Sequence, residues 1–210
     1  MSDCIDCNSY DEENSCCTSN GKSPIRKCIN EIIRNYCTQD LNNKNILEIG
    51  YGRNRYFRRN VKEEGGRWFG LDPHTCGATH KGVAKDAGEI FDELFDIIYA
   101  GQTMEHWRSD EKVAENIKSL HSVLKDGGWL YINVPIYSHG NKMFVLYDEK
   151  KILECLNICS WEKIEFERWR YNYASLAPFN PFRKKFAKKL SVISSQETPS
   201  IWVLEIRLKK

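Results

Sequence analysis

The sequence has 210 residues, a formal net charge of +2, 41% hydrophobic residues and 12% aromatic residues. Such a composition suits one globular domain with a substantial core and excludes a disordered chain. No run approaches the roughly 18 consecutive apolar residues that a membrane-spanning helix needs, and the acidic N-terminus lacks the basic start and apolar run of a signal peptide. We therefore expect a cytoplasmic protein without a membrane span.

The segment 1–23 is polar and shows no apolar period, which predicts a mobile tail before a single domain at 24–210. Five carboxylates against one lysine give this tail a net charge of −4, and it holds four of the nine cysteines, Cys4, Cys7, Cys16 and Cys17. The Cys-x-x-Cys spacing of the first pair occurs in zinc sites, but the second pair is adjacent and no histidine lies nearby. We therefore favour free thiols over a metal site.

From position 24 onward, helical patterns alternate with short apolar runs. Apolar residues recur every three or four positions in four predicted helices, at 24–38, 54–64, 111–124 and 148–159. Short apolar or β-rich runs predict seven strands, at 45–49, 67–71, 82–85, 95–100, 129–134, 162–171 and 200–208. Strands separated by helices form mostly parallel sheets with right-handed crossovers. The sequence therefore predicts an α/β fold.

The C-terminal part of the chain is basic. Ten cationic side chains between positions 168 and 210 face two glutamates, a net charge of +8. They include the run 183–189, which lies in a basic insertion at about 172–199 between the last two predicted strands. A connection of this length is usually functional or disordered. The run is either a solvated helix face or an attractor for a phosphate-bearing substrate; nucleic acid is less favoured because the overall charge is near neutral.

The stretch Leu47-Glu-Ile-Gly-Tyr-Gly-Arg-Asn54 is a strand that ends in a glycine turn and leads into a helix. At the carboxyl end of a parallel sheet, such a turn lets a ligand approach the backbone. A dinucleotide site requires a third glycine where this chain has Arg55, and no phosphate-binding P-loop pattern occurs in the sequence. The turn therefore favours a ligand that has an adenosine but no phosphate.

Two acidic residues follow later strands. Asp72 lies 22 residues after the first glycine of the turn, where an exposed carboxylate can accept hydrogen bonds from both hydroxyls of a ribose; the alternative is a cap on the turn at Pro73. Asp86 follows the third predicted strand with Ala87 and suits a donor such as an exocyclic amino group. Because Glu89 completes a capping-box pattern, Asp86 is also a candidate helix N-cap, and the two roles are compatible.

Five successive stretches resemble, in order and spacing, the class I S-adenosylmethionine-dependent methyltransferases, in particular the group with a Glu-His pair after the fourth strand. These stretches are LEIGYG at 47–52, FGLDP at 69–73, KDAGEI at 85–90, FDIIYAGQTMEHW at 95–107 and LKDGGWLYINVP at 124–135. The resemblance covers about 25–160 and implies S-adenosyl-L-methionine as the cofactor. It also implies a Rossmann-like, mostly parallel seven-stranded sheet with helices on both faces and an antiparallel C-terminal strand.

The resemblance assigns cofactor-binding roles to ten residues: Glu48, Gly50, Tyr51, Gly52, Asp72, Pro73, Asp86, Ala87, Ala100 and Gly101. The residues of the glycine turn would shape the pocket for the cofactor's amino acid part, Asp72 would hold the ribose, and Asp86 with Ala87 would hold the adenine edge. Ala100 and Gly101 would line the cofactor's side at the fourth predicted strand. Many relatives have a small residue where Tyr51 lies, so its ring is expected either to cover the methionine moiety or to narrow the site.

Two histidines are candidates for the chemistry. His106 follows the fourth predicted strand, where a neutral imidazole can take a proton from a hydroxyl as the methyl group arrives. Alternatively, His106 holds the loop or orients the substrate, and in-line positioning makes a base unnecessary. His139 and Tyr137 follow the fifth predicted strand, and together with Arg168 and Arg170 they are expected to contact the substrate.

The sequence thus predicts an enzyme that transfers the methyl group of S-adenosylmethionine to a hydroxyl of a small, sugar-like or phosphate-linked acceptor. Two alternatives of a different class stay open. One is a nucleic-acid or protein methyltransferase that docks through the basic insertion, and the other is a non-catalytic, cofactor-binding partner protein. The Glu105-His106 pair argues against the second alternative.

Overall fold

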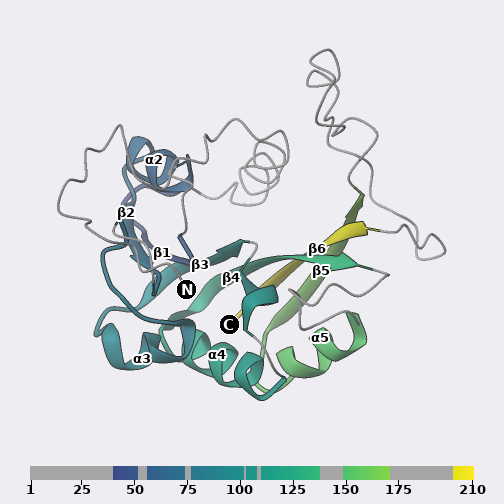
Figure 1. The fold of residues 1–210 in the computed structure, drawn as a ribbon. Helices are drawn as coiled ribbons and strands as arrows, with labels where there is room; N and C mark the ends of the chain where they lie inside the picture. The colour runs from purple at the N-terminus through teal and green to yellow at the C-terminus, as the bar shows by residue number, and fades with distance from the viewer. Residues whose placement is uncertain are drawn as a thin grey trace, which may run out of the picture.

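The computed structural model describes residues 40–51, 56–73, 77–101, 103–107, 110–137, 149–170 and 201–210. The predicted tail, the helix expected at 24–38 and the basic insertion at 172–199 lie outside these ranges. Within them, strands and helices alternate along the chain and form an α/β structure (Figure 1).

Six strands of the described chain form one sheet in the order β2-β1-β3-β4-β6-β5. Their bounds are β1 Asn45–Ile49, β2 Arg67–Leu71, β3 Phe95–Gly101, β4 Leu124–Tyr137, β5 Lys163–Arg170 and β6 Ile201–Lys209. Strands β1 to β4 pair in parallel, and β6 is antiparallel to both of its neighbours, β4 and β5. The predicted Rossmann-like, mostly parallel sheet with an antiparallel C-terminal strand is confirmed.

One predicted strand is wrong, and the described sheet has six strands rather than seven. In place of the strand expected at 82–85, Ala84–Asp86 form the 3-10 helix η2. The free edge of β2 is already occupied by the chain just before this helix. The Thr79 hydroxyl bonds the N–H and C=O of Gly70 at 2.9 and 3.1 Å, and the N–H of His80 donates to the same carbonyl at 3.0 Å. These bonds pair Gly70 with residues 79 and 80, and Leu71 and His80 form an isolated parallel bridge in place of a further strand.

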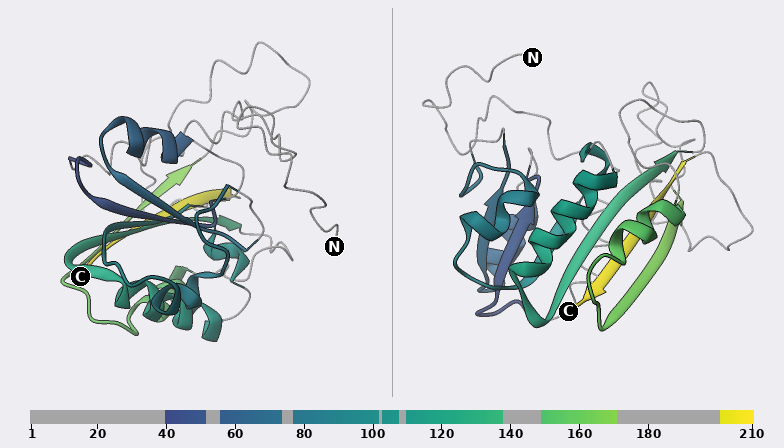
Figure 2. Two further views of the ribbon diagram at one scale, coloured as in Figure 1. Left: turned by 90° about the vertical axis from the view of Figure 1, so that its left-hand side faces the viewer. Right: turned by 90° about the horizontal axis from the view of Figure 1, so that it is seen from below.

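The helices lie on both faces of the sheet, as predicted. Helix α2 covers one face, and α3, α4 and α5 cover the other (Figure 2). Their bounds are α2 Tyr56–Glu63, α3 Ala87–Ile90, α4 Asp110–Ser122 and α5 Glu149–Leu156. Their ends differ by up to three residues from the helices predicted at 54–64, 111–124 and 148–159. None of the helices in the described ranges has the length and apolar character needed to cross a membrane.

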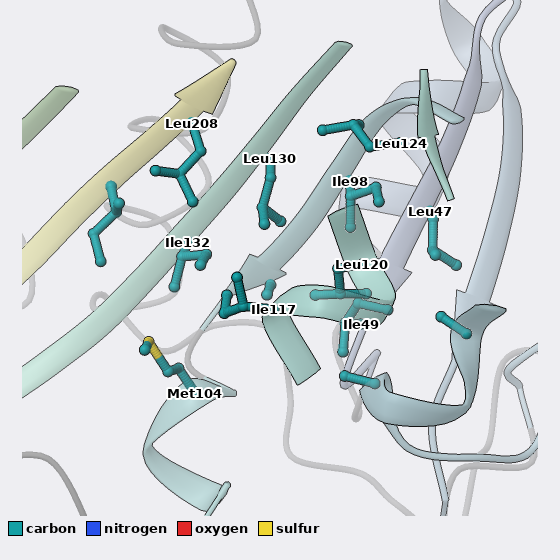
Figure 3. Close-up of a cluster of buried hydrophobic side chains, with 14 of the residues drawn as sticks. Leu47, Ile49, Ile98, Met104, Ile117, Leu120, Leu124, Leu130, Ile132 and Leu208 are labelled. Atoms are coloured by element: carbon teal, nitrogen blue, oxygen red, sulfur yellow. The ribbon is translucent and has the colours of Figure 1, made fainter. Parts of the chain in front are cut away.

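The larger hydrophobic core lies between the sheet and the face covered by α3, α4 and α5. Alternate residues of each strand point into it, such as Leu130 and Ile132 of β4, and α4 supplies Ile117 and Leu120 (Figure 3). Met104, from the 3-10 turn after β3, is fully buried in the same cluster. Burying one such side chain contributes about 1.5–3 kcal/mol, so this face anchors the loops at the sheet's carboxyl edge.

A smaller cluster lies on the opposite face, under α2. It consists of Leu41, Ile46, Tyr51, Phe57, Val61, Trp68, Ile97, Tyr99 and Tyr131. Because side chains alternate along a strand, Glu48 shares this face with Ile46. The acidic residue of the glycine-turn motif therefore points into an aromatic environment.

Strand β4 is longer than predicted. The two glycines at 127 and 128 were expected to open a strand at 129–134, but β4 begins before them and runs to Tyr137. The first residue of β4, Leu124, pairs with Phe95 of β3. The two glycines bond to the last residue, since the N–H of Gly127 donates to the Lys210 carbonyl at 2.6 Å and the N–H of Lys210 donates to the Gly128 carbonyl at 3.1 Å. These bonds extend the pairing of β4 with the last strand to the end of the chain.

Candidate active site

The carboxyl ends of β2, β1 and β3 lie side by side and bring three predicted site residues together. β1 lies between β2 and β3, and Gly50 follows it directly with φ at 65°, a left-handed conformation that favours glycine. The N–H of Gly50 donates to the Leu71 carbonyl at 2.9 Å, which ties the turn to the end of β2. Asp72 follows Leu71, and Gly101 ends β3. The glycine turn, the candidate ribose ligand and the end of β3 therefore share one edge.

Thr103 is a residue of this edge that the sequence analysis missed. Its hydroxyl lies 3.1 Å from the Ile49 carbonyl and 3.1 Å from the Gly101 carbonyl, so it bridges the ends of β1 and β3. A Cβ placed on Gly50 would lie 2.4 Å from the Thr103 hydroxyl oxygen. Glycine at position 50 is thus required both by φ and by the close approach of Thr103. Thr103 lies within the motif at 95–107, but its contact with the glycine turn joins residues that no spacing rule connects.

Glu48 is buried, with 5% of its surface exposed. The indole N–H of Trp68 donates to Glu48 Oε2 at 2.8 Å. Burial raises the pKa of Glu48 to about 8, because the charged form loses its hydration. The Trp68 hydrogen bond and the Arg58 guanidinium lower this pKa, and the Asp72 carboxylate raises it. The carboxyl group of Glu48 is therefore held in its neutral form at neutral pH.

Asp72 is buried too, with 6% exposed, whereas the sequence analysis expects an exposed carboxylate. The reason is the return of the chain along the β2 edge, where the N–H of Asp72 donates to the His80 carbonyl at 3.3 Å. Pro73, the next residue, is exposed. Asp72, the residue proposed from the sequence to bind the ribose, is thus buried at this edge of the sheet.

Asp86 and Ala87 lie at the junction of η2 and α3. Asp86 Oδ2 accepts a hydrogen bond from the Val83 N–H at 3.1 Å, and the Asp86 side chain makes no cap bond to α3. Asp86 is thus the N-cap residue of α3, as predicted, but the side-chain cap bond of a capping box is absent, because the carboxylate turns back to Val83. Ala87 is fully buried in the larger core. Only its backbone is available to a ligand.

Ala100 and Gly101 end β3, as the motif predicts. The Ala100 side chain is fully buried in the larger core, so only its backbone can line a ligand. At Gly101, an added Cβ would overlap the hydroxyl of Tyr99. Tyr51 is also buried, and its ring packs edge-on against Trp68 with centroids 4.9 Å apart. Its ring lies in the cluster under α2.

His106 is exposed and ends the 3-10 turn η3, Met104–His106. The N–H of His106 donates to the Thr103 carbonyl at 2.9 Å. Its neighbours Met104 and Trp107 are both buried in the larger core. These two anchors hold the exposed imidazole at the end of β3, next to the residue that bridges β1 and β3. The side chain of Glu105 lies outside the described part of the structure.

The predicted acceptor residues are only partly described. Tyr137 ends β4 and Arg170 ends β5, and their backbones pair with the first residues of β6. Tyr137, Arg168 and Arg170 therefore lie at the same edge of the sheet as the glycine turn, whereas the positions of their side chains are not described. His139 and Gly52 lie outside the described residues.

Three cations near the end of the chain, Arg207, Lys209 and Lys210, are paired within the fold. Arg207 lies 3.3 Å from Glu167 and 3.6 Å from Glu165, measured from guanidinium nitrogen to carboxylate oxygen. Lys209 and Lys210 contact carboxylates of residues 162 and 126 at 2.6 and 3.6 Å. Their charge is largely compensated, so any attraction for an anionic acceptor depends on the other basic residues. In the described ranges, no group of three or more His, Cys, Asp and Glu residues is placed to hold a metal.

Comparison with known protein families identifies this arrangement. A family model for a methyltransferase domain matches residues 24–196. The chain belongs to this family. The predicted class I methyltransferase, and with it an enzyme, is thereby confirmed, and family and fold together support S-adenosylmethionine as the cofactor. No curated protein matches the chain at a significant level of similarity.

Solved methyltransferase structures share the fold at low sequence identity. An S-adenosylmethionine-dependent methyltransferase from Archaeoglobus fulgidus is 16% identical over 88% of this chain and 94% of its own, with a TM-score of 0.61. The N-methyltransferase NodS from Bradyrhizobium japonicum WM9 is 12% identical over 89% and 96%, with a TM-score of 0.58. Phosphoethanolamine N-methyltransferase 2 from Haemonchus contortus is 14% identical over 87% and 52%, with a TM-score of 0.57.

Proposed function

We propose that this methyltransferase transfers the methyl group of S-adenosylmethionine to a hydroxyl of a small, sugar-like or phosphate-linked acceptor. The observation that carries the cofactor part of the proposal is the turn at Gly50, where a left-handed glycine under Thr103 brings the backbone to the edge shared with Asp72. A bare backbone beside a carboxylate suits an adenosine ligand without a phosphate cradle. S-adenosylmethionine supplies a methyl group activated by its sulfonium.

The residues at this edge fit the cofactor. Asp72 would accept hydrogen bonds from the ribose hydroxyls, and Glu48 with the turn of Gly50 and Gly52 would shape the region for the amino acid part. Asp86, with the backbone of Ala87, receives the adenine edge. The remaining cofactor contacts that we propose come from Tyr51, Pro73, Ala100 and Gly101. The domain carrying this site would span 24–210, with 1–23 as a tail and 172–199 as a basic insertion.

His106 is the proposed general base. Its imidazole is exposed at the end of β3, and buried neighbours on both sides hold the turn that carries it. As the acceptor oxygen bonds to the methyl carbon and the carbon–sulfur bond breaks, His106 would take the hydroxyl proton. Tyr137, His139, Arg168 and Arg170 would contact the acceptor from the ends of β4 and β5. A cationic guanidinium pair would suit a phosphate-linked form.

The relatives of known structure bear on the choice of acceptor. The Haemonchus contortus enzyme was solved with phosphomonomethylethanolamine and S-adenosylhomocysteine, a small phosphate-bearing amine and the demethylated cofactor. This supports a small, phosphate-linked acceptor for the present chain. The same enzyme and NodS are N-methyltransferases, so an amine acceptor is the first rival to a hydroxyl.

The proposal is tested by incubating the full chain with S-adenosylmethionine carrying a labelled methyl group and a panel of acceptors. The panel pairs each sugar or phosphate-linked alcohol with the corresponding amine, and includes RNA and a protein mixture. We expect label in the alcohol products and formation of S-adenosylhomocysteine. Label only in amines, RNA or protein would refute O-methylation of a small acceptor, and cofactor binding without any transfer would favour the partner-protein alternative.

A further inference from the structure

Trp68 connects the two sides of the glycine turn. It lies in β2, in register with Ile46 of β1, so its side chain shares the face of Glu48. Its indole N–H donates to Glu48 Oε2 at 2.8 Å, and its ring meets the ring of Tyr51 edge-on at 4.9 Å. Glu48 precedes Gly50 by two residues and Tyr51 follows it. One buried side chain therefore contacts the turn from both directions.

The ring of Trp68 is held in this position by its surroundings. The Arg58 guanidinium lies over it, 4.9 Å from the ring centroid. A Cβ placed on Gly70 would come within 2.4 Å of the Trp68 ring, so glycine two residues along β2 leaves the space that the ring fills. The ring is 7% exposed and packs in the cluster under α2. Its N–H is thereby fixed in direction toward the carboxyl group.

We propose that Trp68 is a positioning residue for the methyl-donor site, which orients Glu48 and supports Tyr51 so that the turn receives the amino acid part of the cofactor. This inference rests on the proposed function. A buried carboxyl group without its donor would lose a hydrogen bond and rotate away from the strand. The groups that face Glu48 are Trp68 and Gly70 of β2, Tyr99 of β3, Arg58 of α2 and Asp72.

The position of Trp68 predicts which part of the ligand depends on it. Its indole N–H contacts Glu48 and its ring contacts Tyr51, both on the proposed amino acid side, while Arg58 lies over the ring. S-adenosylhomocysteine carries an amino acid part, whereas 5′-methylthioadenosine has the same adenosine without it. Loss of the indole N–H should therefore weaken the binding of S-adenosylhomocysteine and leave the binding of 5′-methylthioadenosine unchanged. A merely structural role would affect both ligands equally.

The test is calorimetric titration of the full chain with both ligands, in the parent and in Trp68→Phe. This variant keeps an aromatic ring but lacks the N–H. Trp161→Phe is the matched control, because the Trp161 indole donates a bond of similar length, 2.9 Å, to the Leu156 carbonyl on the other face of the sheet. Thermal unfolding of each variant reports the fold.

We expect Trp68→Phe to bind S-adenosylhomocysteine about tenfold more weakly, the effect of one hydrogen bond to a carboxyl group, and 5′-methylthioadenosine within about twofold of the parent. Trp161→Phe should bind both as the parent does. Unchanged binding of S-adenosylhomocysteine, or an equal loss of both ligands, would overturn the positioning role while the proposed function stands. A parent that binds neither ligand would overturn both.

A second variant keeps the test independent of any packing change at the ring. Glu48→Leu keeps approximately the size of the side chain but removes the oxygen that accepts the indole N–H. We expect it to lower the affinity for S-adenosylhomocysteine, and the double variant with Trp68→Phe to lose no more than the larger single loss, because both act through one contact. Fully additive losses would contradict the proposal.

Discussion

Thr103 lies directly over Gly50, and a Cβ at position 50 would approach its hydroxyl oxygen to 2.4 Å. The same hydroxyl bridges the Ile49 and Gly101 carbonyls, so the ends of β1 and β3 are joined at the point where the glycine turn begins. The turn is thus shaped by a side chain more than fifty residues away in the sequence. This relationship leaves no room for a side chain at position 50.

Gly50→Ala should therefore destabilise the fold and abolish cofactor binding. The left-handed backbone of the alanine costs roughly 1–2 kcal/mol of folding free energy, and its Cβ in addition displaces Thr103. Gly127→Ala is the matched control, since Gly127 has φ at 77° but nothing within 4 Å of an added Cβ. Chemical denaturation and titration with S-adenosylhomocysteine measure the two effects. In Gly127→Ala the free energy of unfolding should fall only by the cost of the left-handed backbone, and S-adenosylhomocysteine should bind as it does to the parent. Equal binding by both variants would show that Thr103 is not part of the site.

Asp72→Asn should lower the affinity for both S-adenosylhomocysteine and 5′-methylthioadenosine by at least tenfold, because the ribose hydroxyls lose a charged acceptor. The substitution keeps the size of the side chain, so the fold should persist despite the burial of this residue. Asp126→Asn, at a side chain that is 96% exposed, serves as control. Parental affinity in the Asp72 variant would remove the ribose assignment.

His106→Ala should reduce turnover while leaving cofactor binding intact, because the exposed imidazole acts on the acceptor and not on the adenosine. General-base catalysis typically contributes a factor of about 10²–10⁴. His121→Ala is a suitable comparison, as His121 contacts Ser160 and Trp161 away from the carboxyl ends of the strands. Steady-state rates of methyl transfer, measured with an acceptor that the parent methylates, distinguish the two variants. A parental rate in His106→Ala would show that His106 is not a general base and that methyl transfer depends on in-line positioning of the acceptor.

The raised pKa of Glu48 predicts how the free energy of unfolding depends on pH. Burial raises the pKa of Glu48 from 4.5 to about 8, so between these values the folded protein retains a proton that the unfolded chain releases. The stabilisation that comes from this retained proton is fully present below the pKa of Glu48 in the unfolded chain, and it is lost as the pH rises toward 8. The free energy of unfolding should fall by about 1.4 kcal/mol per pH unit in this window from Glu48 alone.

Denaturant titrations of the parent and of Glu48→Gln between pH 5 and 8 check this slope, since the difference between the two proteins cancels the other titrating groups. Carboxylates with a lowered pKa, such as Asp96 beside Lys125 and Glu165 beside Lys163, act in the opposite sense and at lower pH. Parallel pH profiles for the parent and the variant would show that Glu48 is ionised in the folded protein.

The order of strands and helices was predictable because each obeys a local period. The strand at 67–71 agrees with β2 to the residue, since it is apolar and its sequence neighbours are glycines and charges. The strand expected at 82–85 is absent, because the chain meets the edge of β2 earlier, through Thr79 and His80, a contact that no local pattern reveals. β4 begins at Leu124 because that residue pairs with Phe95 of β3, a partner that the local pattern does not show.

The candidate site was predictable where a motif carries it and not where packing does. The glycine turn places Gly50 at the edge of the sheet, and the spacing to Asp72 places that residue beside it. In contrast, the contact of Trp68 with Glu48 depends on the register of β1 and β2, and the bridge made by Thr103 depends on how β3 ends against β1. Such contacts join residues that are distant in sequence and share no spacing rule.

The most direct test of the account is a calorimetric titration of the purified chain with S-adenosylmethionine and S-adenosylhomocysteine, with NAD as the control ligand. The glycine turn with Arg55 in place of a third glycine predicts micromolar binding of the first two ligands and none of NAD. Binding of NAD, or of none of the three, would contradict the assignment of this edge as a methyl-donor site.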